Sequence, residues 1–73
     1  MNEADQVKAL DAGQIIWAAG DKGYCEAWKG RATNEYYTRL DRYMETVAGL
    51  HCSTASQCVQ AFKSLCQQAE ALE

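Results

Sequence analysis

The 73-residue sequence contains no proline. Because proline interrupts helices and is common in turns, its absence favours uninterrupted helices over a turn-rich β fold. Basic side chains are also few, with 7 lysines and arginines against 10 acidic residues and a net charge of -3. Nucleic-acid-binding proteins usually carry a basic excess, because contacts to phosphate supply much of their affinity. We therefore expect no nucleic-acid partner.

Long apolar runs are absent too. None approaches the ~20 residues that span a bilayer, so we expect no membrane-spanning segment. Acidic residues follow Met1 where a secretory signal would carry lysine or arginine. The sequence thus predicts a cytoplasmic protein if Met1 is native. It predicts a periplasmic or extracellular protein if Met1 replaces a removed signal peptide.

Apolar residues make up 48% of the sequence and charged residues 23%, as in an ordinary globular domain. We expect residues 1–73 to form a single domain. A chain of this length buries only about 60% of its unfolded surface, so its core is thin. Such domains often need a disulfide, a metal or a partner for stability.

The C-terminal segment predicts a helix from Ala55 to Leu72. Apolar residues recur there at steps of three, one and three, which places them on one helical face. Thr54 followed by Gln57 is a capping-box pattern at its start. The apolar residues of this face are Ala55, Cys58, Val59, Phe62, Leu65, Cys66, Ala69 and Leu72.

The middle segment predicts a second helix from Asn34 to Leu50. Its apolar residues step by four and three, and two further residues widen the stripe. Glu35 and Arg39 form a favourable i,i+4 pair. The stripe contains Tyr36, Leu40, Tyr43, Val47 and Leu50, widened by Tyr37 and Met44.

The first segment is compatible with two structures. A helix from about Asp5 to Trp28, kinked or broken near Gly20, aligns its apolar residues on one stripe. A hairpin over residues 14–29 is the alternative, because the sequence from Gly20 to Gly23 is typical of a turn. Two glycines inside a helix cost about 1 kcal/mol each, but an isolated hairpin is marginally stable. The helix is favoured, and the predicted fold is all-α: a small antiparallel three-helix bundle.

Four cysteines are more than this length usually carries, but none forms a C-x-x-C motif. A zinc site would need His51, Cys52 and Cys58 to converge with a fourth ligand, and this spacing matches no common structural site. We therefore expect neither a metal nor another cofactor.

In the predicted bundle, Cys25 and Cys66 lie near the level of residues 36–40, and Cys52 lies close to Cys58. Either pair then approaches the ~5.5 Å Cα separation of a disulfide. If the chain is oxidised, we expect Cys25–Cys66 and Cys52–Cys58 bonds. The Cys25–Cys66 bond closes the longer loop, of about 40 residues, and would add roughly 3 to 4 kcal/mol to the free energy of unfolding. The alternative, which the sequence favours equally, is that all four thiols are free and that Cys58 and Cys66 are small buried apolar residues.

The chain has seven aromatic residues, more than one thin core can cover. Tyrosine, tryptophan and arginine are the residues that most often anchor protein interfaces. We predict an interface in the first segment, unless its small residues pack against the second helix within the chain. The candidate interface residues are Gly13, Trp17, Gly20, Gly23, Tyr24 and Trp28.

No phosphate loop, nucleophile elbow or metalloprotease helix is present, and no catalytic residue is predicted. We expect a small non-enzymatic protein-binding or regulatory module, acting as a homodimer or as an inhibitor or adaptor on a larger protein. The alternative is an exported, disulfide-stabilised helical protein, such as an inhibitor or an immunity-type factor. A thiol-based enzyme or a metal site is the third hypothesis, since His51 adjoins Cys52.

Overall fold

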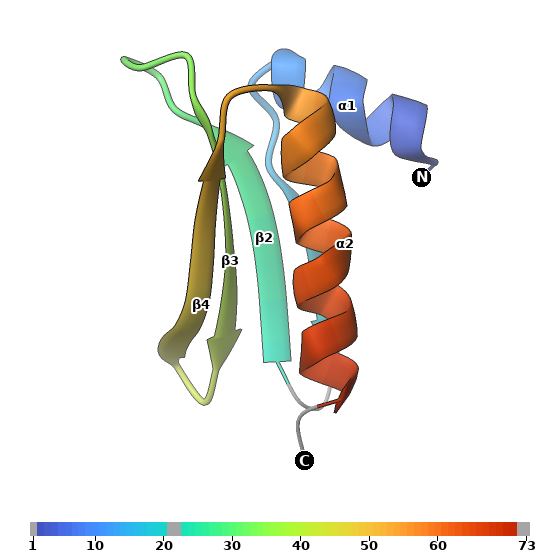
Figure 1. Cartoon of the computed structure of the whole chain (residues 1–73), viewed down its shortest axis with the longest axis vertical. Helices are drawn as coiled ribbons and strands as arrows, with labels where there is room; N and C mark the ends of the chain where they lie inside the picture. Colours follow the sequence, from blue (N-terminus) through green and yellow to red (C-terminus); the bar gives the residue numbers. More distant parts are fainter. Residues whose placement is uncertain (1, 21–22, 72–73) are drawn as a thin grey trace.

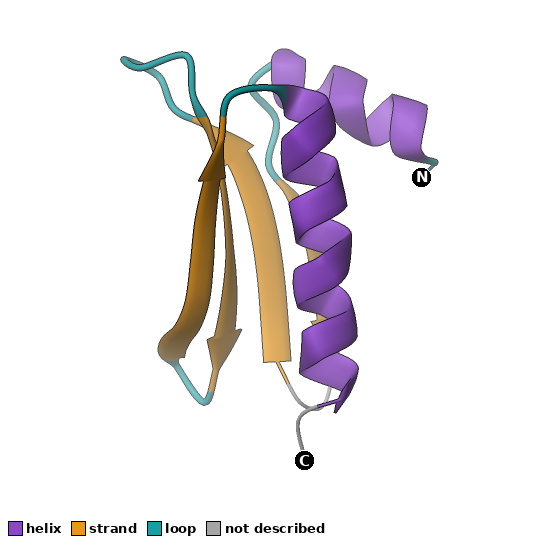
Figure 2. Ribbon diagram, in the orientation of Figure 1, coloured by secondary structure: helices purple, strands orange, loops and turns teal. Residues whose placement is uncertain are grey.

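The computed structural model describes residues 2–20 and 23–71, and it is an α+β fold (Figures 1 and 2). Four antiparallel strands form one sheet in the order β1-β2-β3-β4, and both helices pack on the same face of it. The predicted all-α three-helix bundle is therefore wrong. The elements are α1 (Glu3–Asp11), β1 (Ile16–Gly20), β2 (Gly23–Lys29), β3 (Tyr36–Arg42), β4 (Glu45–Cys52) and α2 (Ala55–Ala71).

The first helix is far shorter than predicted, because Gly13 ends it. This glycine has a φ of 83°, in the left-handed region. Its N–H donates to the Leu10 carbonyl, and the Gln14 N–H donates to the Ala9 carbonyl. These two bonds form a Schellman motif, which satisfies the last carbonyls of the helix and turns the chain towards the sheet.

Replacing Gly13 by alanine should lower the free energy of unfolding by about 1 kcal/mol, because an L-residue is strained at this φ. A Cβ there meets no atom within 4 Å, so the cost is purely a backbone cost. Gly20→Ala is the matched control, since its Cβ also meets no atom and its φ is not in that region. Urea unfolding should show a change below about 0.5 kcal/mol for the control. Equal losses in the two variants would contradict the Schellman motif.

The rest of the predicted first helix is the hairpin of β1 and β2, the alternative that the turn-like sequence indicated. Gly20 pairs with Gly23 at its end, and residues 21 and 22 between them lie outside the described part of the chain. Cys25 and Ala27 are buried under α2, and Glu26 between them faces the other way. The hairpin is stable because it belongs to a four-stranded sheet backed by a helix.

A second hairpin, β3 and β4, replaces the predicted helix over residues 34–50. Tyr36, Thr38 and Leu40 are buried in alternation, the period of a strand. Tyr43 and Met44 form the turn, and both have positive φ values, of 51° and 68°. A two-residue turn of this kind matches the twist of a hairpin.

The predicted C-terminal helix is present as α2 and begins at Ala55 as expected. Its predicted last residue, Leu72, lies outside the described residues. The capping prediction is confirmed in part, because the Gln57 N–H donates to the Thr54 hydroxyl over 3.2 Å. The Gln57 side chain accepts from the Ser53 N–H instead of closing the box on Thr54.

The core lies between the sheet and the two helices. Its largest fully buried side chains include Leu10 from α1, Leu40 from β3, and Val59 and Leu65 from α2. Thr38 is the buried polar residue of this layer, and its hydroxyl donates to the Glu26 carbonyl over 2.9 Å. Within residues 2–20 and 23–71, neither helix is long and apolar enough to cross a membrane.

Candidate interface on the open face of the sheet

The face of the sheet opposite the helices carries a row of large side chains from all four strands. We call it the open face, since neither α1 nor α2 packs against it (Figure 1). Its residues alternate with the buried ones along β2 and β3. The cross-strand register aligns them in rows: Trp17 with Glu26 and Arg39, Tyr24 with Asp41, and Trp28 with Tyr37 and His51.

Aromatic rings on the open face stack in pairs. The ring centroids of Trp17 and Tyr24 are 6.2 Å apart, and those of Trp28 and Tyr37 are 5.7 Å apart, with 25° between the planes in each pair. His51 extends the second pair, 6.1 Å from the Tyr37 ring. Trp17 is 63% exposed. Stacked aromatic pairs of this kind stabilise each other by about 0.5 to 1.5 kcal/mol beyond the area they bury.

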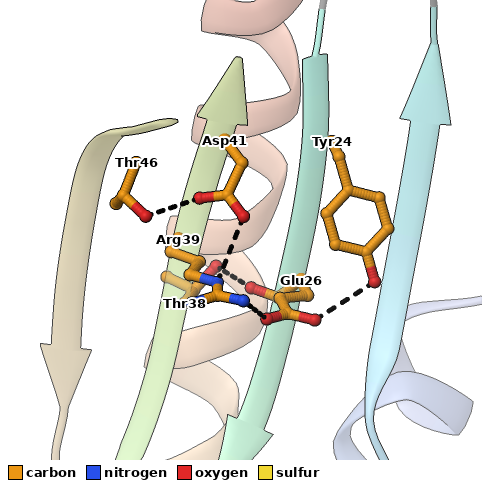
Figure 3. A network of polar contacts seen from close by, with 6 residues as sticks. All are labelled: Tyr24, Glu26, Thr38, Arg39, Asp41 and Thr46. Atoms are coloured by element: carbon orange, nitrogen blue, oxygen red, sulfur yellow. Dashed lines mark hydrogen bonds and ion pairs between the residues drawn. The ribbon is translucent and has the colours of Figure 1, made fainter. Parts of the chain in front are cut away.

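A polar network lies beside the Tyr24 ring (Figure 3). The Arg39 guanidinium is 2.6 Å from a Glu26 oxygen and 3.4 Å from an Asp41 oxygen, and it lies over the Trp28 ring at 5.6 Å. The Tyr24 hydroxyl donates to Glu26 over 3.1 Å. Partial burial and this bond raise the pKa of Tyr24 above its ordinary value. The network contains two carboxylates and one guanidinium, so the centre of the open face carries an excess of negative charge.

An open hollow of about 340 Å³ lies at one end of the open face. Tyr24 and Asp41 form part of its wall, and the Thr46 hydroxyl donates to the other side of the Asp41 carboxylate over 2.7 Å. The hollow combines aromatic surface with a carboxylate, which suits a cationic side chain. Its lining residues are Ala19, Gly20, Gly23, Tyr24, Asp41, Tyr43 and Met44.

The structure places the six residues predicted as an interface in two separate regions. Trp17, Tyr24 and Trp28 lie on the open face, and the paired Gly20 and Gly23 border the hollow. Gly13 is separate, at the end of α1. No helix joins these residues, because β1 and β2 form a hairpin.

Sequence reasoning missed Tyr37 and Arg39 as members of this face. Tyr37 was predicted to widen a buried helical stripe, and Arg39 to pair with Glu35 along a helix. In β3 both lie on the open side, where Tyr37 contacts Trp28 and Arg39 pairs with Glu26. Strand alternation from the buried Leu40 would have identified them.

The four cysteines are free thiols on the opposite face, between the sheet and α2. Burial raises the pKa of Cys25 to about 12, and the neighbouring Cys66 thiol adds to the effect by charge and hydrogen bonding. Burial raises the pKa of Cys58 to about 12 as well, and the Cys52 thiol adds to it in the same way. The structure therefore has Cys25 beside Cys66 and Cys52 beside Cys58.

His51 and Cys52 do not form a catalytic pair. Successive residues of a strand point to opposite faces. The His51 ring lies on the open face against Tyr37, while Cys52 packs towards the core beside Cys58. Residues 2–20 and 23–71 contain no group of three or more histidine, cysteine and acidic residues able to hold a metal ion.

No family model, curated protein or solved structure matches the chain. We therefore infer a function from the chemistry of the open face itself.

Proposed function

We propose that this chain is a non-enzymatic protein-binding module that contacts its partner through the open face. The observation that carries the proposal is the row of stacked aromatic rings, with Arg39 among them, on a sheet face that neither α1 nor α2 covers. Tryptophan, tyrosine and arginine dominate the energetically important positions of protein interfaces. Because the sheet already orders these side chains, little conformational entropy is lost when a partner binds.

The charge of the open face favours a foreign protein that presents apolar residues beside lysine or arginine. The two negative charges of Glu26 and Asp41 outnumber the one positive charge of Arg39. The hollow beside Tyr24 suits a lysine or arginine side chain of the partner. A second copy of this chain would bring the same negative excess, on a protein whose net charge is already -3. Nucleic acid would bring phosphates to the same carboxylates. An inhibitor or adaptor that acts on a basic surface fits these charges best.

The test uses the intrinsic fluorescence of the chain. Its two tryptophans, Trp17 and Trp28, both lie on the open face, so their emission reports directly on that face. A synthetic peptide of alternating leucine and lysine serves as the probe, and an alternating leucine and glutamate peptide serves as its charge control. We expect saturable quenching or a blue shift with the lysine peptide, and at least about tenfold weaker binding of the glutamate peptide.

Two variants decide whether the open face is responsible. Trp17→Ala removes an exposed ring and should weaken binding about tenfold, read from the remaining Trp28 emission. Leu50→Ala, which truncates another exposed apolar side chain on the other side of the sheet, should leave binding unchanged. Equal effects of the two variants, or tighter binding of the glutamate peptide or an oligonucleotide, would refute the proposal. A dimer in sedimentation that Trp17→Ala abolishes would show a second copy as the partner instead.

A further inference from the structure

The four thiols are grouped as two pairs across one interface. Each pair has one cysteine on the sheet, Cys25 in β2 or Cys52 at the end of β4, and the other on α2. β2 and α2 lie side by side and run in opposite directions, so the start of the strand is close to the end of the helix (Figure 1). This arrangement brings Cys66 to Cys25, and the tight connection from β4 to α2 brings Cys58 to Cys52.

Contacts outside the pairs fix these positions. Cys25 pairs in the sheet with Ala18 on one side and Leu40 on the other, and its side chain is 2% exposed. The Cys58 thiol, fully buried, donates to the Tyr37 carbonyl over 3.4 Å. The second thiol of each pair, Cys66 or Cys52, is only partly buried at the rim of the core. Each pair thus combines a buried thiol with one that solvent reaches.

We propose that these pairs are sites of oxidation, and that Cys25–Cys66 and Cys52–Cys58 disulfides fasten α2 to the sheet when the chain meets a disulfide oxidant such as oxidised glutathione. This inference is independent of the open face, which carries no cysteine. The bonds belong to an oxidising compartment, where small domains with thin cores most often use them.

The exchange takes place in two steps for each pair. The thiolate of the accessible cysteine, Cys66, attacks oxidised glutathione, forms a mixed disulfide and releases one glutathione thiolate. The Cys25 sulfur then attacks the Cys66 sulfur, and the second glutathione leaves with the proton from Cys25. Two protein thiols are oxidised and one glutathione disulfide is reduced to two thiols. The same exchange joins Cys52 to Cys58.

The buried member of each pair controls when this can happen. A thiol whose pKa is about 12 is almost entirely protonated at pH 8, and only the thiolate attacks. The second step is therefore slow while α2 is packed on the sheet. We expect the bonds to form during folding, when Cys25 and Cys58 are still exposed to water.

Tryptic peptides test the pairing. The chain is refolded from urea in a mixture of reduced and oxidised glutathione, alkylated and digested without reductant. Trypsin yields one peptide with Cys25 (residues 23–29), one with both Cys52 and Cys58 (residues 43–63), and one with Cys66 (residues 64–73). We expect peptide 23–29 joined to peptide 64–73, and peptide 43–63 closed on itself and lighter by two hydrogens. A link from 23–29 to 43–63, or four alkylated cysteines, would overturn the proposal.

Thermal unfolding measures what the bonds contribute. Oxidation should raise the Tm of the wild-type chain by more than about 10 °C, because the Cys25–Cys66 bond closes a long loop. Cys66→Ser should lose most of this gain, while Cys52→Ser, its matched control, should keep most of it. The reduced forms of both variants are measured first, so that a loss of folding is distinguished from a loss of the bond. Equal gains in the two variants would show that the long loop is not closed.

Discussion

Replacing Leu40 by alanine is expected to remove most of the stability of this domain. Leu40 is 1% exposed and lies in the centre of the sheet, paired with Cys25 and Ala48 and covered by α2. Truncating a fully buried leucine costs about 2 to 5 kcal/mol, because the cavity left behind collapses only partly. The total stability of a chain this small is on the order of 5 kcal/mol. Urea unfolding followed by circular dichroism should show a much lower midpoint or no folded baseline.

Leu50→Ala is the control for this experiment. Leu50 lies in the neighbouring strand on the same side of the sheet, but it is 51% exposed. Its truncation should cost less than about 1 kcal/mol. In the predicted helix both leucines belonged to one buried stripe, so equal losses would support that helix and contradict the sheet.

Alkaline pH is expected to unfold the reduced protein. Burial raises the pKa of Cys25 and Cys58 from 9.0 to about 12, so the folded state binds protons that the unfolded state has released. The stability from these thiols is fully present below pH 9 and is lost as the pH rises through 12. The slope is up to about 1.4 kcal/mol per pH unit for each thiol. The raised pKa values of Tyr24 and Tyr36 act in the same direction above pH 10.

Urea titrations at a series of pH values, with reductant present, measure this slope. The free energy of unfolding should be nearly constant from pH 7 to 8.5 and then fall. Cys58→Ala lowers stability at every pH, but it removes one titrating group and should make the fall less steep. A wild-type stability that is flat from pH 9 to 11, or an unchanged slope in the variant, would contradict the burial of these thiols.

The helix α2 could be predicted because its apolar residues recur without interruption over nearly five turns, after a recognisable cap at Thr54. The hairpin of β3 and β4 could not be predicted by the same reading. Tyr36 and Leu40 are four residues apart, a spacing that fits one face of a helix and one face of a strand equally well. The turn at Tyr43 and Met44 contains neither glycine nor asparagine, although both residues have positive φ.

Three residues of the open face were predicted to share a surface, for a reason that the structure corrects. Trp17, Tyr24 and Trp28 were grouped because their spacing of seven and four fits a helical stripe. They share a surface instead because Tyr24 and Trp28 are an even number of residues apart on β2, and so lie on the same face of the sheet. Trp17 lies beside them on β1. The neighbouring cysteines were likewise inferred from a bundle that does not form. The pairing between β2 and β3 could not be predicted from the spacing of apolar residues within one segment, because it depends on contacts between two segments.

In the two central strands, β2 and β3, whether a residue number is odd or even determines which face of the sheet its side chain lies on. We call this the odd–even rule. In β2 the even-numbered residues from 24 to 28 lie on the open face, and the odd-numbered residues 25 and 27 lie in the core. Paired positions of β2 and β3 sum to 65, an odd number, so the rule is reversed in β3. If every position of β2 and β3 is substituted, the largest losses of stability should therefore fall at odd-numbered positions of β2 and at even-numbered positions of β3. Inserting one residue at the start of β2 would exchange the two faces of this strand, turning the Tyr24 and Trp28 rings inward and Cys25 outward. Residues of the proposed interface and residues of the core thus alternate along the same two strands.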